Sequence, residues 1–261
     1  MYPYPVFLGL TLYELFIVIG FVSAVLIYRV LADRETVPAS VQNLCLFGGF
    51  AGLAGGYLLA VVVQAFYNYM EDGVFEITGH TGATFYGGLI GGAAVFLLIY
   101  FGVGYFVCRK REHLRYFWRI SDFAAAGIAS AHGFGRLGCL MAGCCYGRET
   151  DSVFGIYMSA LGRRVIPVQL YEAVFLFLLA AFLIFRTVRG KSYALPLYMV
   201  LYGVWRFAVE YLRGDDRGAT VVPFLSPSQL TAVALVIGAG IVFFFERRYS
   251  RTHPVAEEDH E

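Results

Sequence analysis

Two arginines of this chain, Arg136 and Arg206, lie inside long apolar stretches rather than in the loops that hold its other basic residues. An arginine at the middle of a membrane helix costs at least about 2.5–3.5 kcal/mol on insertion scales, so it usually has a function. Arg206 belongs to the series Tyr202-x3-Arg206-x3-Glu210, whose spacing places all three side chains on one helix face. Arg136 follows His132 by one helical turn. Two guanidinium groups that face a common pocket suit a phosphate, which they bind through paired hydrogen bonds.

A structural ion pair between Arg206 and Glu210 is the alternative interpretation. It leaves unexplained a third ion, Arg213, and two tyrosines in line with it, Tyr198 and Tyr202. Further polar residues stand near the ends of neighbouring apolar stretches. They are Tyr13, Glu14, Tyr86, Gln169, Tyr171 and Glu172. Asp122 is interpreted as structural, because a carboxylate at the start of the fourth apolar stretch complements the dipole of that helix.

Glycines and cysteines surround Arg136. Five glycines between His132 and Arg148, among them Gly135 and Gly147, permit either close helix packing or close approach of a ligand. Cys139, Cys144 and Cys145 fall within seven residues, whereas Cys45 and Cys108 are isolated and expected to be inert.

The clustered cysteines have several interpretations. They could be small residues that fill space, or a thiolate activated by Arg136 that acts as a nucleophile. Redox use and a soft-metal site with three sulfur ligands also stay open. Their spacing matches no usual zinc pattern, and the sequence predicts no resident metal and no nucleotide or organic cofactor.

The elements that must position these residues are membrane helices. Hydrophobic residues make up 59% of the chain and charged residues only 15%, against about one quarter charged in a soluble domain. Apolar blocks long enough to span a bilayer recur seven times. They run approximately from Phe7 to Ile27, Val41 to Phe66, Thr84 to Val107, Ser121 to Gly143, Val168 to Phe185, Tyr193 to Leu212 and Ser228 to Phe245. The sequence therefore predicts an all-α integral membrane protein with one seven-helix domain over residues 1–253 and a disordered acidic tail over 254–261.

Basic residues fix the expected orientation. They are concentrated in alternate loops, with five between Arg109 and Arg119, three between Arg186 and Lys191 and three between Arg247 and Arg251. The positive-inside rule makes these loops cytoplasmic, so the N-terminus is outside and the C-terminus is inside. Arg136 and Arg206 then lie in the outer half of the bilayer, where an anionic phospholipid can supply a phosphate. The net charge of +1 gives no indication of nucleic-acid binding.

The chain resembles the prolipoprotein diacylglyceryl transferases of bacteria over nearly its whole length. The resemblance rests on Tyr13, Phe85-Tyr86-Gly-Gly-Leu-Ile-Gly, Gly135-Arg136-Leu-Gly with Gly147, Pro167-Val-Gln169-Leu-Tyr171-Glu172, and Tyr202-Gly-Val-Trp-Arg206-Phe-Ala-Val-Glu210. It implies an enzyme of the bacterial inner membrane that moves a diacylglyceryl group from phosphatidylglycerol to a cysteine thiol of a lipoprotein precursor. Arg136 and Arg206 would hold the phosphate, and Glu210 would orient Arg206. The substrate would be lined by Tyr13, Gly135, Cys139, Gly147, Gln169, Tyr171, Glu172 and Tyr202.

The sequence also departs from the family pattern. Tyr86 stands where the family usually has a histidine, and Cys139, Ala142 and Cys144 replace two asparagines and a glutamate. The general base therefore stays open between His132, Tyr86 and Glu210. Two other functions also stay open: a relative that uses the same lipid pocket for another acceptor or for thiol chemistry at Cys144 and Cys145, and a lipid-binding or transport protein without chemistry.

Overall fold

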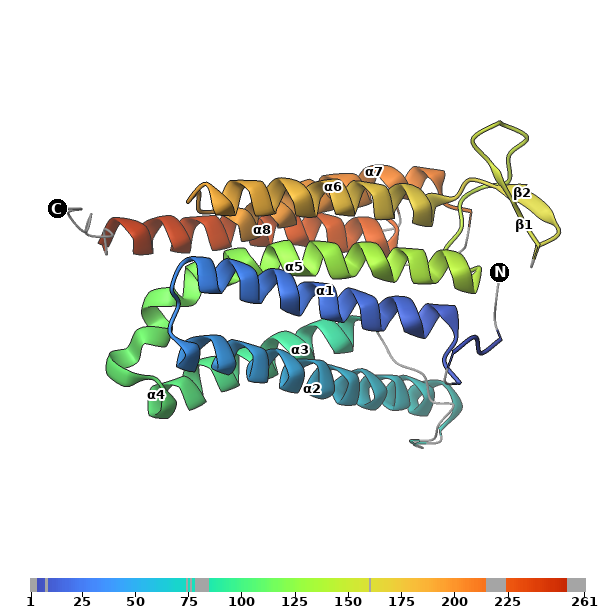
Figure 1. Cartoon of the computed structure of the whole chain (residues 1–261). Helices are drawn as coiled ribbons and strands as arrows, with labels where there is room; N and C mark the ends of the chain where they lie inside the picture. The colour runs from blue at the N-terminus through green and yellow to red at the C-terminus, as the bar shows by residue number, and fades with distance from the viewer. Residues whose placement is uncertain are drawn as a thin grey trace. The chain divides into compact units, whose positions relative to one another are not determined.

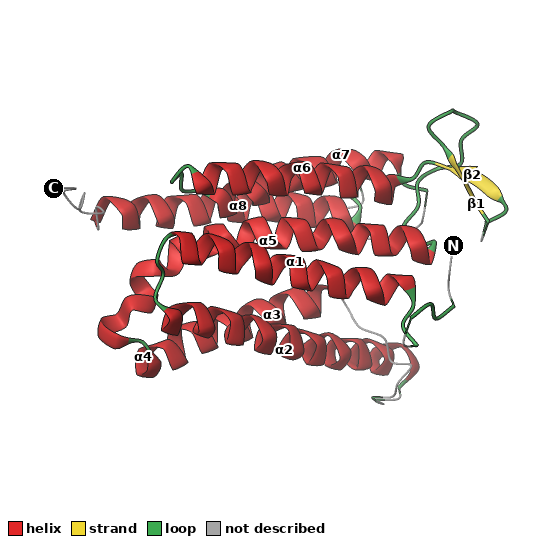
Figure 2. Ribbon diagram, viewed as in Figure 1, coloured by secondary structure: helices red, strands yellow, loops and turns green. Residues whose placement is uncertain are grey.

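The computed structural model describes residues 4–7, 9–73, 75, 77, 85–159, 161–214 and 224–252, and almost all of its regular structure is helical (Figure 2). The longer helices are α1 (Leu12–Arg34), α2 (Ala39–Asp72), α3 (Phe85–Leu98), α5 (Glu112–Ala142), α6 (Val168–Val188), α7 (Ala194–Val209) and α8 (Pro227–Thr252). A π-helical turn (Ile99–Val103) and α4 (Gly104–Val107) continue α3, and 3-10 turns cover Arg109–Arg111 and Glu210–Leu212. The acidic tail 254–261 lies outside the described residues.

Each predicted apolar block coincides with one of these longer helices, so the all-α prediction is confirmed. Five helical segments of the described chain are long and apolar enough to cross a membrane: Leu12–Arg34, Ala39–Met70, Gly87–Val107, Val168–Val188 and Pro227–Thr252. The helices α5 and α7 do not meet that measure. The polar residues His132 and Arg136 lower the hydropathy of α5, and α7 has only 16 residues before it tightens into the 3-10 turn.

The chain forms two compact units, one of residues 32–120 and one of residues 1–31 with 121–261. In the first, α2 and α3 pack through glycines at four-residue spacing. A Cβ on Gly56 would lie 2.6 Å from the carbonyl oxygen of Gly88, and one on Gly52 would lie 2.9 Å from that of Gly92. Such contacts are possible only without side chains, as in membrane helix pairs with small residues every fourth position.

The second unit holds the polar residues singled out above, apart from Tyr86. Small residues also bring α1 against α5, because a Cβ on Gly20 would lie 2.9 Å from the carbonyl oxygen of Ala131 and one on Gly127 would lie 2.8 Å from that of Ala24. Helix α7 packs along both α6 and α8 (Figure 1). Between α5 and α6 the chain forms an antiparallel hairpin, β1 (Ile156–Met158) and β2 (Arg163–Val165), that extends past the helix ends (Figure 1).

Side-chain hydrogen bonds cap the N-termini of two helices in this unit. Thr11 and Glu14 cap α1 reciprocally, since the Thr11 amide donates to Glu14 Oε2 at 2.7 Å and the Glu14 amide donates to Thr11 Oγ1 at 3.3 Å. Ser226 and Gln229 form the same capping box at the start of α8, with amide to side-chain distances of 3.1 and 3.2 Å. Glu14 thus has a structural role at the helix end.

Asp122 is structural, but the prediction that it starts its own helix is wrong. Helix α5 begins at Glu112, so Asp122 lies well inside it. Its Oδ1 instead accepts the backbone amides of Ala194 at 2.6 Å and Leu195 at 3.0 Å. Glu246 of α8 accepts the amide of Tyr193 at 3.1 Å. Two carboxylates from neighbouring helices therefore satisfy amides that the first turn of α7 would otherwise leave unpaired.

Candidate active site

One group of polar side chains forms around a fully buried carboxylate, Glu172 of α6. Its Oε1 receives the Tyr202 hydroxyl at 2.8 Å and an Arg136 guanidinium nitrogen at 3.1 Å. His132 completes the group, with Nε2 at 3.4 Å from the Tyr202 hydroxyl and Nδ1 at 3.3 Å from the Tyr198 hydroxyl. Three helices, α5, α6 and α7, thus each contribute to one buried polar cluster.

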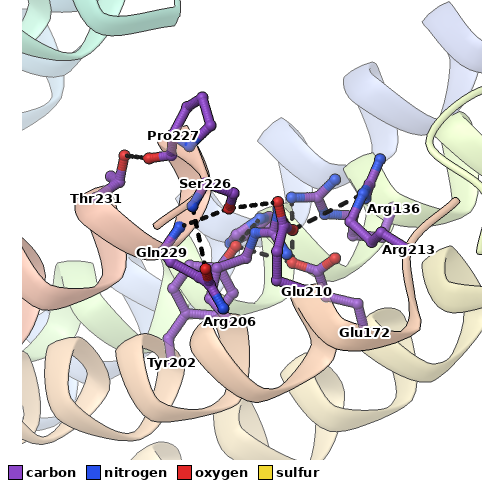
Figure 3. A network of polar contacts seen from close by, with 11 residues as sticks. Arg136, Glu172, Tyr202, Arg206, Glu210, Arg213, Ser226, Pro227, Gln229 and Thr231 are labelled. Carbon is purple, nitrogen blue, oxygen red and sulfur yellow. Dashed lines mark hydrogen bonds and ion pairs between the residues drawn. The ribbon is translucent and has the colours of Figure 1, made fainter. Parts of the chain in front are cut away.

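The second group surrounds Glu210, just past the end of α7. The ion pair indicated by the four-residue spacing is formed, with Arg206 Nη2 at 2.6 Å from Glu210 Oε2. Arg213 Nε lies at 3.9 Å from the same oxygen, and the Ser226 hydroxyl donates to Oε1 at 2.7 Å. Figure 3 shows members of both groups in one network, with Arg136, Arg206 and Arg213 near Glu172 and Glu210.

The network carries more positive charge than its own carboxylates balance. Three arginines and two glutamates leave one positive charge, and the arginine side chains are at most 17% exposed. Within the described residues, Arg136 Nε and Arg206 Nη1 are buried nitrogens with no hydrogen-bond partner. A buried donor without a partner loses roughly 1–3 kcal/mol of solvation, so these nitrogens are available to a ligand that brings oxygen atoms and negative charge.

The cysteine cluster lies beside this network, and the helix end explains how it forms. Gly143 has a left-handed φ of 78°, and the Cys144 amide donates to the Cys139 carbonyl at 3.2 Å, which is the Schellman arrangement that ends α5. Cys145 also has a positive φ, of 62°, which is uncommon for a residue other than glycine. These two turns bring the sulfur atoms of Cys139, Cys144 and Cys145 within 4.8 Å of one another.

Neighbouring thiols and a guanidinium group change the pKa of the Cys145 thiol, which lies past the end of α5. A hydrogen bond from the Cys139 thiol lowers the pKa of the Cys145 thiol, and the Arg213 guanidinium lowers this pKa further. Burial raises the pKa of the Cys144 thiol, and its neighbour Cys145 raises it further. The backbone here is fixed by Gln169, whose side-chain amide donates to the Cys144 carbonyl. The cluster and the arginine network are therefore adjacent through Arg213.

The remaining predicted site residues have different positions. Tyr13 is close enough to interact with all three clustered thiols and with Arg136. Gly135 is open, with its nearest neighbour, a methyl of Ile17, 3.8 Å from where a Cβ would be. The Tyr171 hydroxyl donates to the Phe154 carbonyl at 2.9 Å and is outside the network. Tyr86 is the second residue of α3, in the other unit, and its side chain lies outside the described part of the structure.

Gly147 positions Arg213. The two residues form an isolated β-bridge, which ties the loop after α5 to the end of α7. A Cβ on Gly147 would lie 2.7 Å from the Leu212 carbonyl oxygen, so only glycine fits there. Sequence reasoning missed Ser226, which anchors Glu210. Its sequence signal was Ser226-Pro-Ser-Gln229, a capping-box pattern that marks a helix start.

Comparison with known proteins identifies the family. A sequence profile of the prolipoprotein diacylglyceryl transferases matches residues 5–245. The chain belongs to this family. It is 32% identical over 245 residues to phosphatidylglycerol–prolipoprotein diacylglyceryl transferase 2 of Clostridium perfringens, covering 89% of each protein. It is 31% identical over 246 residues to the enzyme of the same activity name from Clostridium tetani, covering 90% of this chain and 92% of the relative. A third relative, from Glaesserella parasuis, is 31% identical over 206 residues, covering 76% of this chain and 73% of the relative.

Proposed function

We propose that this protein transfers the diacylglyceryl group of phosphatidylglycerol to a cysteine thiol of a lipoprotein precursor. The observation that carries the proposal is the buried network of three arginines and two glutamates, with its surplus positive charge. Its nitrogens Arg136 Nε and Arg206 Nη1 have no hydrogen-bond partner among the described residues. The names of the family relatives support a transferase over the alternatives of transport or lipid binding without chemistry.

The arginines suit the leaving group of this reaction. The thiol sulfur forms a bond to the carbon of the diacylglycerol unit that bears the phosphate ester. The bond from this carbon to the ester oxygen breaks, and its electron pair leaves with the phosphate of glycerol phosphate. Negative charge on that phosphate grows as the bond breaks. Arg136 and Arg206, already oriented by Glu172 and Glu210, meet this charge without reorganisation, which is how preorganised donors accelerate a reaction.

Two candidate bases for the thiol proton differ in their contacts. Glu210 is held by Arg206, Arg213 and the Ser226 hydroxyl, and a carboxylate in that many contacts is a weak proton acceptor. Among the described residues, His132 makes longer contacts, at 3.3 and 3.4 Å, with two tyrosine hydroxyls, and its ring packs against that of Tyr202. Both side chains stay candidates for the base.

We infer the membrane arrangement from the helix lengths and from the distribution of basic residues among the loops. Residues 1–253 form one domain with seven spans, with the N-terminus outside and the C-terminus in the cytoplasm. The long helices and the alternation of basic loops support this topology. It places the arginine network in the outer half of the inner membrane, within reach of outer-leaflet phosphatidylglycerol and of a precursor that has been exported.

A transfer assay with the full chain in detergent tests the proposal. Phosphatidylglycerol is the donor, a peptide with a lipobox cysteine is the acceptor, and mass spectrometry detects the added diacylglyceryl mass. Arg136→Ala and Arg206→Ala are each expected to lower the rate by about 100-fold or more, as the loss of one preorganised donor does elsewhere. Arg163→Ala is the matched control, because Arg163 is exposed in the hairpin and pairs with exposed Glu149 at 3.1 Å. Absence of transfer by the unchanged protein would contradict the proposal.

A further inference from the structure

We propose that Cys139, Cys144 and Cys145 form a site for a thiophilic divalent cation, Zn²⁺, whose open fourth position binds the thiol of the acceptor cysteine. This inference rests on the proposed transferase function for the identity of the acceptor. The site itself rests on the geometry of the three sulfur atoms.

The sulfur atoms already lie close to the arrangement that a zinc ion requires. With a Zn–S bond of about 2.3 Å, three thiolates at tetrahedral angles are ~3.8 Å apart. The three sulfur atoms here lie within 4.8 Å of one another. Closing them onto an ion therefore shortens each separation by no more than ~1 Å.

The backbone favours a three-sulfur site over a chance grouping. Two left-handed residues, Gly143 and Cys145, lie where the chain turns back over the last turn of α5. The turn at Cys145 is strained for a side chain other than glycine, and strain of this kind persists where surrounding contacts hold it. Those contacts are present, because Gln169 binds the Cys144 carbonyl and the Gly147 bridge holds the following loop.

Charge also fits a bound cation. Three thiolates and one Zn²⁺ leave a single negative charge. The guanidinium group of Arg213 contacts Cys145, so it can offset that charge while Arg136 and Arg206 remain for the phosphate. Arg213 would not compete for the metal, because a guanidinium group is not a ligand.

The three-cysteine site is accessible to a fourth ligand and lies next to the arginine network. Cys144 is exposed, and Cys139 and Cys145 are partly exposed, so a fourth ligand can reach an ion held by the three sulfur atoms. A zinc site with three protein ligands and an open fourth position is the catalytic arrangement, and a thiol that coordinates zinc is deprotonated outright. Arg213, which lies between Cys145 and Glu210, places this position next to the phosphate-binding arginines.

The step balances without another reactant. The acceptor thiol binds the ion and releases its proton to water. The sulfur, still the nucleophile, then forms the carbon–sulfur bond as the carbon–oxygen bond to phosphate breaks, and the thioether product leaves the ion. This would remove the need for a strong base beside the acceptor thiol.

Metal content and affinity test the site without reference to activity. The full chain is purified in detergent with reductant, loaded with Zn²⁺, and analysed for bound metal by mass spectrometry and by competition with a chromogenic chelator. We expect Cys139→Ala, Cys144→Ala and Cys145→Ala each to lower zinc affinity by more than the roughly 10–100-fold that loss of an outer-shell partner costs. Cys45→Ala and Cys108→Ala are the controls, because these buried cysteines lie in the other unit, and they should bind zinc as the unchanged protein does.

A spectroscopic experiment tests the fourth position. With Co²⁺ in place of Zn²⁺, the acceptor peptide should strengthen the sulfur-to-cobalt charge-transfer band, whereas the same peptide with serine for cysteine should not. Equal zinc binding by all variants, or a disulfide among the three cysteines in the reduced and loaded protein, would overturn the site. An unchanged cobalt spectrum would overturn the role in acceptor binding. Undiminished transfer by metal-free Cys139→Ala would refute this inference while leaving the proposed function intact.

Discussion

Replacing Glu210 by glutamine tests whether the carboxylate between Arg206 and Arg213 is part of the catalytic machinery. Glutamine has nearly the same shape and keeps an oxygen to accept the Ser226 hydroxyl, which donates to Glu210 Oε1 at 2.7 Å. It replaces the charged oxygen that Arg206 contacts at 2.6 Å by a neutral group. The Glu210→Gln protein should therefore fold, but with Arg206 poorly oriented.

The burial of the ion pair determines how much stability and activity Glu210→Gln should lose. The Arg206 and Glu210 side chains are 7% and 9% exposed, so water cannot replace the lost partner. Removing one member of a buried ion pair costs about 3–5 kcal/mol of stability, because the other charge is left unpaired. If Arg206 thereby loses its place at the leaving phosphate, the barrier rises by about 2.7–4 kcal/mol, which lowers the rate by roughly 100- to 1,000-fold.

The assay is peptide lipidation at saturating phosphatidylglycerol, with thermal unfolding in the same detergent as a second readout. Glu149→Gln is the matched control, since Glu149 pairs with Arg163 at 3.1 Å and the two side chains are 61% and 48% exposed. An exposed pair contributes about 0–1 kcal/mol, so this variant should be as active and nearly as stable as the unchanged protein. If Glu210→Gln retains activity within a few-fold of the control, the assigned role of the pair in orienting Arg206 is wrong.

Four further substitutions probe the framework, each followed by thermal unfolding in detergent. Gly147→Ala should destabilise the protein by about 1–3 kcal/mol, because its Cβ would lie 2.7 Å from the Leu212 carbonyl oxygen. Gly240→Ala, where a Cβ meets nothing within 4 Å, should instead be neutral or stabilising by up to about 1 kcal/mol. Gly56→Ala should destabilise the α2–α3 pair by a similar 1–3 kcal/mol, and an unchanged melting temperature would argue against that close packing. Asp122→Ala should cost about 1–3 kcal/mol through the two amides it leaves unpaired at α7.

The sequence predicted the helices well because apolar blocks and span length are set by the same physical requirement. Their ends were less predictable. Helix α5 begins at Glu112, some distance before its apolar part, because the chain continues as helix through polar residues that no hydrophobic pattern marks. Asp122 was consequently taken for a helix start. Its real partners, the amides of Ala194 and Leu195, belong to another helix, and one sequence contains no direct signal of that contact.

The contacts of the candidate site were also predictable only in part. Arg206 with Glu210 was predictable because a spacing of four on one helix fixes their neighbourhood. The pair of Arg136 with Glu172 depends on how α5 packs against α6, so its members could be proposed but their contact could not. Gly143 before two cysteines was a usable signal. A glycine at the end of a helix predicts a Schellman turn, and that turn brings Cys144 back to Cys139.

The carboxylates at the start of α7 have a mechanical consequence. Because Asp122 and Glu246 hold that end, α7 behaves as a rod with a fixed pivot, and any tilt displaces its far end most. Arg206 lies roughly 18 Å along the axis from Ala194, so a tilt of ~5° moves it sideways by ~1.5 Å. A misplacement of about 1 Å can cost a hundredfold in rate. The contacts at the start of α7 therefore help to set how accurately Arg206 is placed. Asp122 and Glu246 thus influence the reaction from almost a full helix length away.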